Sequence, residues 1–277
     1  MANKSVGLLT IAFGADLRSF DKAMKKAQRS IKKFGVSMQK TGENLTRNVT
    51  LPVLGLGIAA IKMASDYEES LNKVRVSFGK TSHSVEEFAK TTLTNFGIAE
   101  GSALEMASLF GDMGTSMGLT QKQAAKMSIS MVGLAGDLSS FKNISQDIAQ
   151  TALASVFTGE TESLKKLGIV MTETNLKQFA LENGITQSIK TMSQAQKVQL
   201  RYNFVMSKSA NALGDYLKTS DGVANSTRKL QESIKQLAEK FGTLLIPEAK
   251  KIIAELQRLV DVFANMSKEQ KENLIFW

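Results

Sequence analysis

The sequence contains no cysteine, and among its 277 residues it has only two prolines, one histidine and one tryptophan. The absence of cysteine excludes disulfide bonds and thiol chemistry. With a single histidine, His83, and no acidic cluster at ligand spacing, the sequence argues against a transition-metal site. The first residues, MANKSVGLLTIAFGADL, lack the long apolar core and the cleavage site of a signal peptide. No apolar run approaches the roughly 18 residues of a membrane-spanning helix.

Apolar residues make up 43% of the chain, which is enough for a sizeable core. Low proline content, together with abundant alanine, leucine, lysine, glutamine and methionine, favours helix. No alternation of strands and helices suggests a nucleotide-binding fold. We therefore expect a mainly α protein in which a multi-helix core domain is flanked by long amphipathic helices of coiled-coil type. A short strand is possible at residues 5–13.

Positive charge is concentrated at the start of the chain. Residues 1–50 hold 10 Lys and Arg against 3 Asp and Glu, a net charge of +7 out of the total +9. Such an arm suits nucleic acid, an acidic membrane surface or an acidic protein partner. A solvated helix face is an equally good interpretation of the same charges.

The first segment, residues 1–48, is predicted to be a basic arm containing an amphipathic helix. Apolar residues recur at alternating steps of three and four, a heptad seam formed by Leu17, Phe20, Met24, Ala27, Ile31, Phe34 and Met38. The candidate partner-binding residues lie off this seam and are Lys22, Lys25, Lys26, Arg29, Lys32 and Lys33. The helix could form a coiled coil, pack on its own domain or lie on a membrane.

The second segment, residues 49–80, combines an uncharged run with a charged helix. Pro52 fits the first turn of a helix, so we expect a helix from about Pro52 to Phe78. Gly55 and Gly57 destabilise a helix by about 1 kcal/mol each relative to alanine, which suggests a packing reason. With Ala59, Ala60 and Ala64 they would allow another helix to approach closely. That neighbour could be a copy of the chain, its own core or a membrane.

The third segment, residues 81–226, is predicted to be a compact core of helices ended by glycines, such as those at Gly97 and Gly159. Thr120, Ser145 and Ser193 are the expected N-caps. A turn is expected at residues 112–114, and one long helix is expected after Ser193.

The fourth segment, residues 227–277, is predicted to be rod-like. Leu230, Ile234, Leu237, Phe241 and Leu244 form one heptad row, and a second row is formed by Ala249, Ile252, Leu256, Leu259, Phe263 and Met266. Pro247 is expected to interrupt the rod. Ser267 and Gln270 match a capping box, which predicts a new helix. The sequence then stops in an open apolar ending, so we expect that the chain is a fragment or comes from a truncated gene. The candidate helix-packing residues are Pro52, Gly55, Gly57, Leu230, Ile234, Leu237, Phe241, Leu256 and Phe263.

Catalytic motifs find little support in the sequence. GTSMG at 114–118 matches the G-x-S-x-G pattern of a nucleophile elbow, but that elbow needs a strand before Ser116 and a histidine base. The surrounding pattern is helical, and GKTS at 79–82 lacks the upstream glycine of a P-loop. We therefore expect no enzymatic activity and no cofactor.

Three stretches resemble the N-terminal core region of phage tail tape measure proteins, of the type found in siphovirus-like phages and prophages of Gram-positive bacteria. They are LTRNVTLPVLGLGIAAIKMASDYEESLNKV at 45–74, LAGDLSSFKNISQDIAQTALASVFTGETESLKKLGIVM at 134–171, and MSQAQKVQLRYNFVMSKSANALGDYLKTSDGVANSTRKLQESIKQLAEKFGTLLIP at 192–247. The resemblance extends over the whole chain, is strongest at 134–247, and includes the order and spacing of the stretches.

The resemblance implies a structural protein that occupies the tail tube lumen, sets tail length and assists DNA ejection. The partners it implies are tail assembly chaperones, the tail tube and tail tip proteins, and further copies of the chain, with possible contacts to DNA and, during ejection, to a membrane. The protein would be located in the host cytoplasm during assembly and in the virion tail afterwards. The family usually continues into hydrophobic or wall-degrading segments, and the sequence departs from it in length. A basic helical protein of a prophage that binds DNA or membrane is the alternative.

Overall fold

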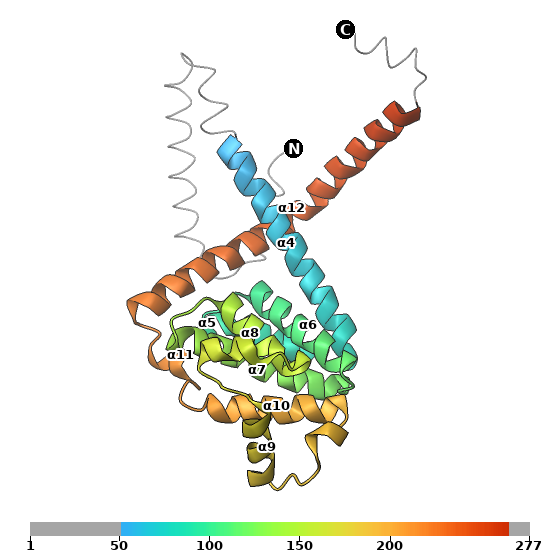
Figure 1. Ribbon diagram of the computed structural model, residues 1–277. Helices are drawn as coiled ribbons and strands as arrows, with labels where there is room; N and C mark the ends of the chain where they lie inside the picture. Colours follow the sequence, from blue (N-terminus) through green and yellow to red (C-terminus); the bar gives the residue numbers. More distant parts are fainter. Residues whose placement is uncertain (1–50, 266–277) are drawn as a thin grey trace. The chain divides into compact units, whose positions relative to one another are not determined.

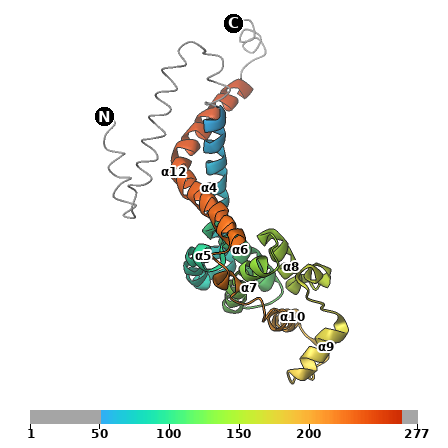
Figure 2. The same cartoon turned by 90° about the vertical axis from the view of Figure 1, so that its left-hand side faces the viewer.

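The computed structural model describes residues 51–265, which form helices joined by short loops, with no strand among them (Figures 1 and 2). The α-helices are α4 (Leu51–Phe78), α5 (Ser82–Phe96), α6 (Glu100–Ser116), α7 (Gln121–Phe141), α8 (Gln146–Thr158), α9 (Glu173–Glu182), α10 (Gln194–Lys208), α11 (Asp215–Lys218) and α12 (Val223–Asn265). Short 3₁₀ helices are η2 (Gly79–Thr81), η3 (Thr161–Leu167) and η4 (Ile189–Thr191). The mainly α fold is confirmed. The predicted strand at 5–13, the arm helix and the capping box at Ser267 lie outside the described residues.

Helix ends in the core follow the predicted caps. The Thr120 hydroxyl accepts the backbone N–H of Gln123, whose side chain binds back to the Thr120 N–H, a complete capping box. Ser193 forms the same box at the start of α10. Gly97 ends α5 with φ of 64° and Gly159 ends α8 with φ of 83°, left-handed conformations that glycine adopts without a steric penalty.

The turn expected at residues 112–114 is wrong, because these residues lie inside α6. The glycines of this helix serve close packing instead. A Cβ on Gly111 would stand 2.2 Å from the ring of Phe78, and one on Gly114 would stand 3.2 Å from Leu119. The helix ends only at Ser116, two residues before Gly118 adopts φ of 90°.

The long helix expected after Ser193 is also shorter than predicted. α10 ends at Lys208, and Gly214, with φ of 74°, begins the single turn of α11. The buried carboxylate of Asp137 in α7 accepts the backbone N–H groups of Gly214 at 2.8 Å and Tyr216 at 3.2 Å. This tertiary contact fixes a corner that local helix propensity alone does not predict.

The core is built around α6 and α7, which pack against each other and against α5 and α8. The rings of Phe110 in α6 and Phe157 in α8 stack with centroids 5.9 Å apart. Phe179 of α9 meets Phe204 of α10 edge to face at 5.4 Å, and α10 packs in turn on α8. This apolar cluster runs from Val74 to Ala212 in sequence.

Helix α12 continues through Pro247, where an interruption was expected. Proline has no N–H to donate to the carbonyl of Thr243, and its ring crowds that turn, which commonly bends a helix without ending it. Figure 2 shows α12 bowed along its length. The helix is therefore one element of 43 residues, and the two heptad rows, as far as Phe263, lie on the same helix.

Small residues do allow a close helix approach, as predicted for this part of α4. A Cβ built on Gly242 of α12 would lie 1.9 Å from the carbonyl oxygen of Ala60 and 2.8 Å from the Cβ of Ala64. Figure 1 shows α4 and α12 crossing. Close packing at Ala60 and Ala64 is thus made within the chain itself.

Candidate functional site

An exposed apolar surface that the sequence predicted lies on α12. Its five residues are all substantially exposed: Leu230 61%, Ile234 59%, Leu237 55%, Phe241 44% and Leu244 45%. At about 100° per residue they lie within roughly 40° of one line along the helix. We call these five residues the apolar stripe. Its length and regularity distinguish it from isolated apolar residues, which are common on any protein surface.

The opposite face of α12 docks on the core through polar side chains. Glu232 accepts the N–H of Ala99 at 3.0 Å, Gln236 that of Glu100 at 3.2 Å, and Glu239 that of Gly101 at 3.3 Å. These three side chains are spaced by four and three residues, so they share one side of the helix. By the same rotation per residue, Glu239 stands about 180° from Leu230.

The docked amides belong to the start of α6, where Ala99 occupies the N-cap and has no side chain that can cap. The first N–H groups of a helix have no partner within the helix, and they carry its positive dipole end. Glu232 and Glu239 satisfy two of these groups and bring carboxylates to that end of the helix. The side chains of α12 thus replace a local cap.

A basic side chain of α12 binds the C-terminal end of a second core helix, α7. The guanidinium of Arg228 donates to the carbonyls of Ser139 at 3.1 Å and Ile144 at 3.3 Å, where α7 ends. Asn225, which is buried, donates to the hydroxyl of Ser140 at 2.7 Å and accepts from Arg228. A cation at the carbonyl end of α7 complements the dipole there.

Glu239 is the most perturbed acid at this contact. Burial raises its pKa from the usual 4.5 to about 7, although Lys235 and the Gly101 N–H act in the opposite direction. The carboxylates of Glu100 and Glu232 add to the rise. Tyr67 of α4 donates to Glu100 at 2.9 Å, and burial raises the pKa of its hydroxyl.

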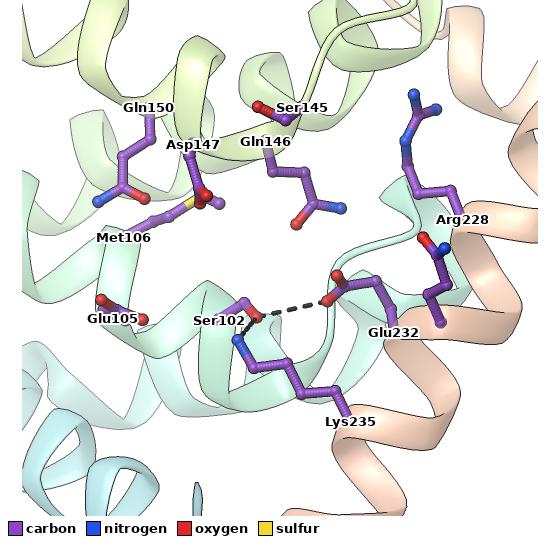
Figure 3. Close-up of a pocket in the computed structure, with 11 residues that line it drawn as sticks. Ser102, Glu105, Met106, Ser145, Gln146, Asp147, Gln150, Arg228, Glu232 and Lys235 are labelled. Atoms are coloured by element: carbon purple, nitrogen blue, oxygen red, sulfur yellow. Dashed lines mark hydrogen bonds between the residues drawn. The ribbon is translucent and has the colours of Figure 1, made fainter.

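A polar pocket of about 260 Å³ lies beside this contact, between α6, α8 and α12 (Figure 3). Ser102 stands in it between Glu232 and Lys235, donating to the carboxylate at 3.4 Å and accepting from the ammonium at 2.8 Å. Glu105 and Asp147 also line the pocket. Within residues 51–265, no group of three or more histidines and acids could hold a metal ion.

The predicted candidate residues are only partly placed by the structure. Pro52, Gly55 and Gly57 lie in the first turns of α4, and Leu256 and Phe263 lie in the later part of α12. The six basic residues of the arm, Lys22 to Lys33, lie outside the described residues. Ser116 is exposed at the end of a helix, so the strand-to-helix elbow is absent there. No helix within residues 51–265 is both long and apolar enough to cross a membrane.

Sequence reasoning missed the polar face of α12. Glu232, Gln236 and Glu239 match the hydrophilic side of an amphipathic helix, which normally faces water. One signal was available, because the sequence GIAEGSAL at 97–104 begins a helix without a capping residue. The free N–H groups at a helix start without its own cap need hydrogen-bond acceptors from another part of the protein.

No protein-family model, no curated protein and no solved structure matches the chain.

Proposed function

We propose that this chain is the N-terminal part of a phage tail tape measure protein, a structural component of the tail tube lumen. The observation that carries the proposal is the apolar stripe on α12, exposed on a helix of 43 residues and directed away from the core. A stripe at heptad spacing fits another helix, because side chains repeating every 3.5 residues interlock with a matching row. The stretches at 45–74, 134–171 and 192–247 support the same assignment.

The helix supplies the physical basis of a ruler. An α-helix rises about 1.5 Å per residue, so the 43 residues of α12 span roughly 65 Å. In a tape measure protein, tail length follows residue number because each residue adds a fixed rise. We propose that α12 begins the measuring rod and that the helical core precedes it.

The stripe also favours copies of the chain as partners. At coiled-coil register the positions beside it are Gln231, Ser233, Ala238 and Lys240, of which only Lys240 is charged. Like charges therefore do not line the seam between two identical helices. Tail assembly chaperones, the tail tube and tail tip proteins, DNA during ejection and a host membrane are the further partners of this proposal. The location would be the tail lumen, preceded by the host cytoplasm.

Tail length in the full parent gene tests the proposal. An in-frame deletion of two heptads between Ala249 and Phe263 spares the half of α12 that docks on the core. Negative-stain microscopy should show tails shorter by about 1.5 Å per deleted residue, or roughly 20 Å. A two-heptad insertion at the same place is the matched control and should lengthen tails equally.

Unchanged lengths in both variants would show that α12 is not part of the ruler. A chain that binds DNA instead, through its basic arm, would show an affinity that falls steeply with salt.

A further inference from the structure

The contact of α12 with α6 and α7 is almost wholly polar, and its close apolar packing lies at the crossing with α4, where Gly242 meets Ala60 and Ala64. Residues 225–239 reach the core through Asn225, Arg228, Glu232, Lys235, Gln236 and Glu239. Among the α12 residues whose side chains are described, Ile246 is the one buried apolar residue. Polar contacts exchange readily with water, so separating such a surface exposes little apolar area.

Helix α12 supplies no side chain to the main apolar cluster. The hydrophobic cluster found among the described residues begins at Val74, ends at Ala212 and includes no residue of α12. All the buried side chains of this cluster therefore come from residues that precede α12. The apolar stripe of α12 lies on the side opposite the core. Docking therefore leaves exposed the residues through which α12 would pair with another helix.

We propose that α12 is a releasable arm: Glu232, Gln236 and Glu239 latch it to the first turn of α6, and when the latch opens it leaves both the core and the crossing with α4 as an intact helix. The three side chains bind three successive amides, so they act as one unit. When α12 is released, those amides form hydrogen bonds with water instead. Release of α12 is tested on the isolated chain, so a negative result would not contradict the proposed tape measure function.

Glu239 makes the latch sensitive to its protonation state. The carboxylate faces Glu100 of α6 and Tyr67 of α4, and its own helix adds Glu232 and the opposing charge of Lys235. Its pKa is raised from 4.5 to about 7 when docked. A raised pKa means that docking favours the protonated acid, so docking weakens as pH rises from about 4.5 towards 7.

The absence of cysteine allows a direct measurement of release. Thr91→Cys in α5 and Lys240→Cys in α12 place two spin labels at exposed positions, and no other thiol can react. Double electron–electron resonance on the full chain should give one narrow distribution of the distance between the two labels at pH 5. The triple change Glu232→Ala, Gln236→Ala and Glu239→Ala should convert most molecules to a broad, longer distance without loss of helical circular dichroism.

A matched control removes a carboxylate that plays no part in docking. Glu182→Ala on α9 should leave the distance narrow, since Glu182 is exposed and bonds to Gln178 of its own helix. A narrow distance in the triple variant would overturn the latch. A longer distance accompanied by lost helix signal would overturn release as an intact helix.

The pH dependence provides a second readout. In the parent, the released-to-docked ratio should rise with pH between about 5 and 7, by at most tenfold per unit because one proton is linked to docking. Glu239→Gln keeps an oxygen that can accept the Gly101 N–H, and it should flatten this dependence. A ratio that falls with rising pH, or a slope that survives Glu239→Gln, would contradict the role of Glu239.

Discussion

Gly242 of α12 lies against the backbone of Ala60 in α4 so closely that a Cβ atom would stand 1.9 Å from the Ala60 carbonyl oxygen. The obstacle is backbone, so no side-chain rotation can relieve the clash. The crossing of α4 and α12 therefore depends on glycine at this position. It is also where the small-residue segment of α4 meets the rod-like helix.

Replacing Gly242 with alanine should lower stability even though alanine is the better helix former. Helix propensity alone would stabilise α12 by about 1 kcal/mol. Forcing atoms into a filled contact typically destabilises by about 1–3 kcal/mol, and here the clash is with backbone. We expect a lower thermal midpoint by calorimetry for Gly242→Ala. Ala254→Leu, at an exposed site of the same helix, is the control and should change the midpoint little; a higher midpoint for Gly242→Ala would show that the two helices separate freely.

A charge within the apolar stripe should prevent self-association without unfolding the core. Leu237 is 55% exposed, so Leu237→Glu leaves no cavity in the monomer. It would bury a carboxylate at the centre of any seam between two copies, which is strongly unfavourable. By sedimentation equilibrium, the parent chain should form an oligomer and the Leu237→Glu chain should be a monomer.

Lys229→Glu provides the comparison, since it adds a carboxylate to an exposed, off-stripe position of the same helix. That variant should associate like the parent. Equal association of the Leu237→Glu chain would mean that copies meet through some other surface.

Removal of the Tyr216 hydroxyl should be neutral or stabilising. The ring is fully buried against Gly97, and among the described residues its hydroxyl has no hydrogen-bond partner. A buried hydroxyl without a partner destabilises a protein by about 1–3 kcal/mol. Tyr216→Phe should therefore keep the urea midpoint or raise it. Tyr202→Phe, at a partly exposed site, serves as the control, and a loss confined to Tyr216→Phe would show that the hydroxyl has a partner such as water.

Local sequence signals predicted the local features of the core well. Thr120 and Ser193 cap the helices that they were expected to cap, because a hydroxyl and the glutamine three residues later need only the first turn of the helix. Gly97 and Gly159 end their helices because the left-handed conformation is a property of the single residue. Signals of this kind span at most four residues.

Apart from the interruption expected at Pro247, the errors arose where a distant residue decided the outcome. Residues 112–114 indicated a turn from sequence, but the glycines at 111 and 114 lie inside α6, where the ring of Phe78 and the side chain of Leu119 approach the positions that a Cβ would take. The corner at Gly214 depends on Asp137, which lies 77 positions away in the chain. No local pattern carries that information.

The sequence by itself determined the helical class, the caps and the apolar stripe of α12, because composition and periodicity act within single helices. Only the tertiary structure decided which face of α12 meets the core. Periodicity shows that a helix has two faces, but it does not say what each face contacts. Here the polar face is docked, because the first amides of α6 need acceptors that Glu232, Gln236 and Glu239 provide, and the apolar stripe faces outward.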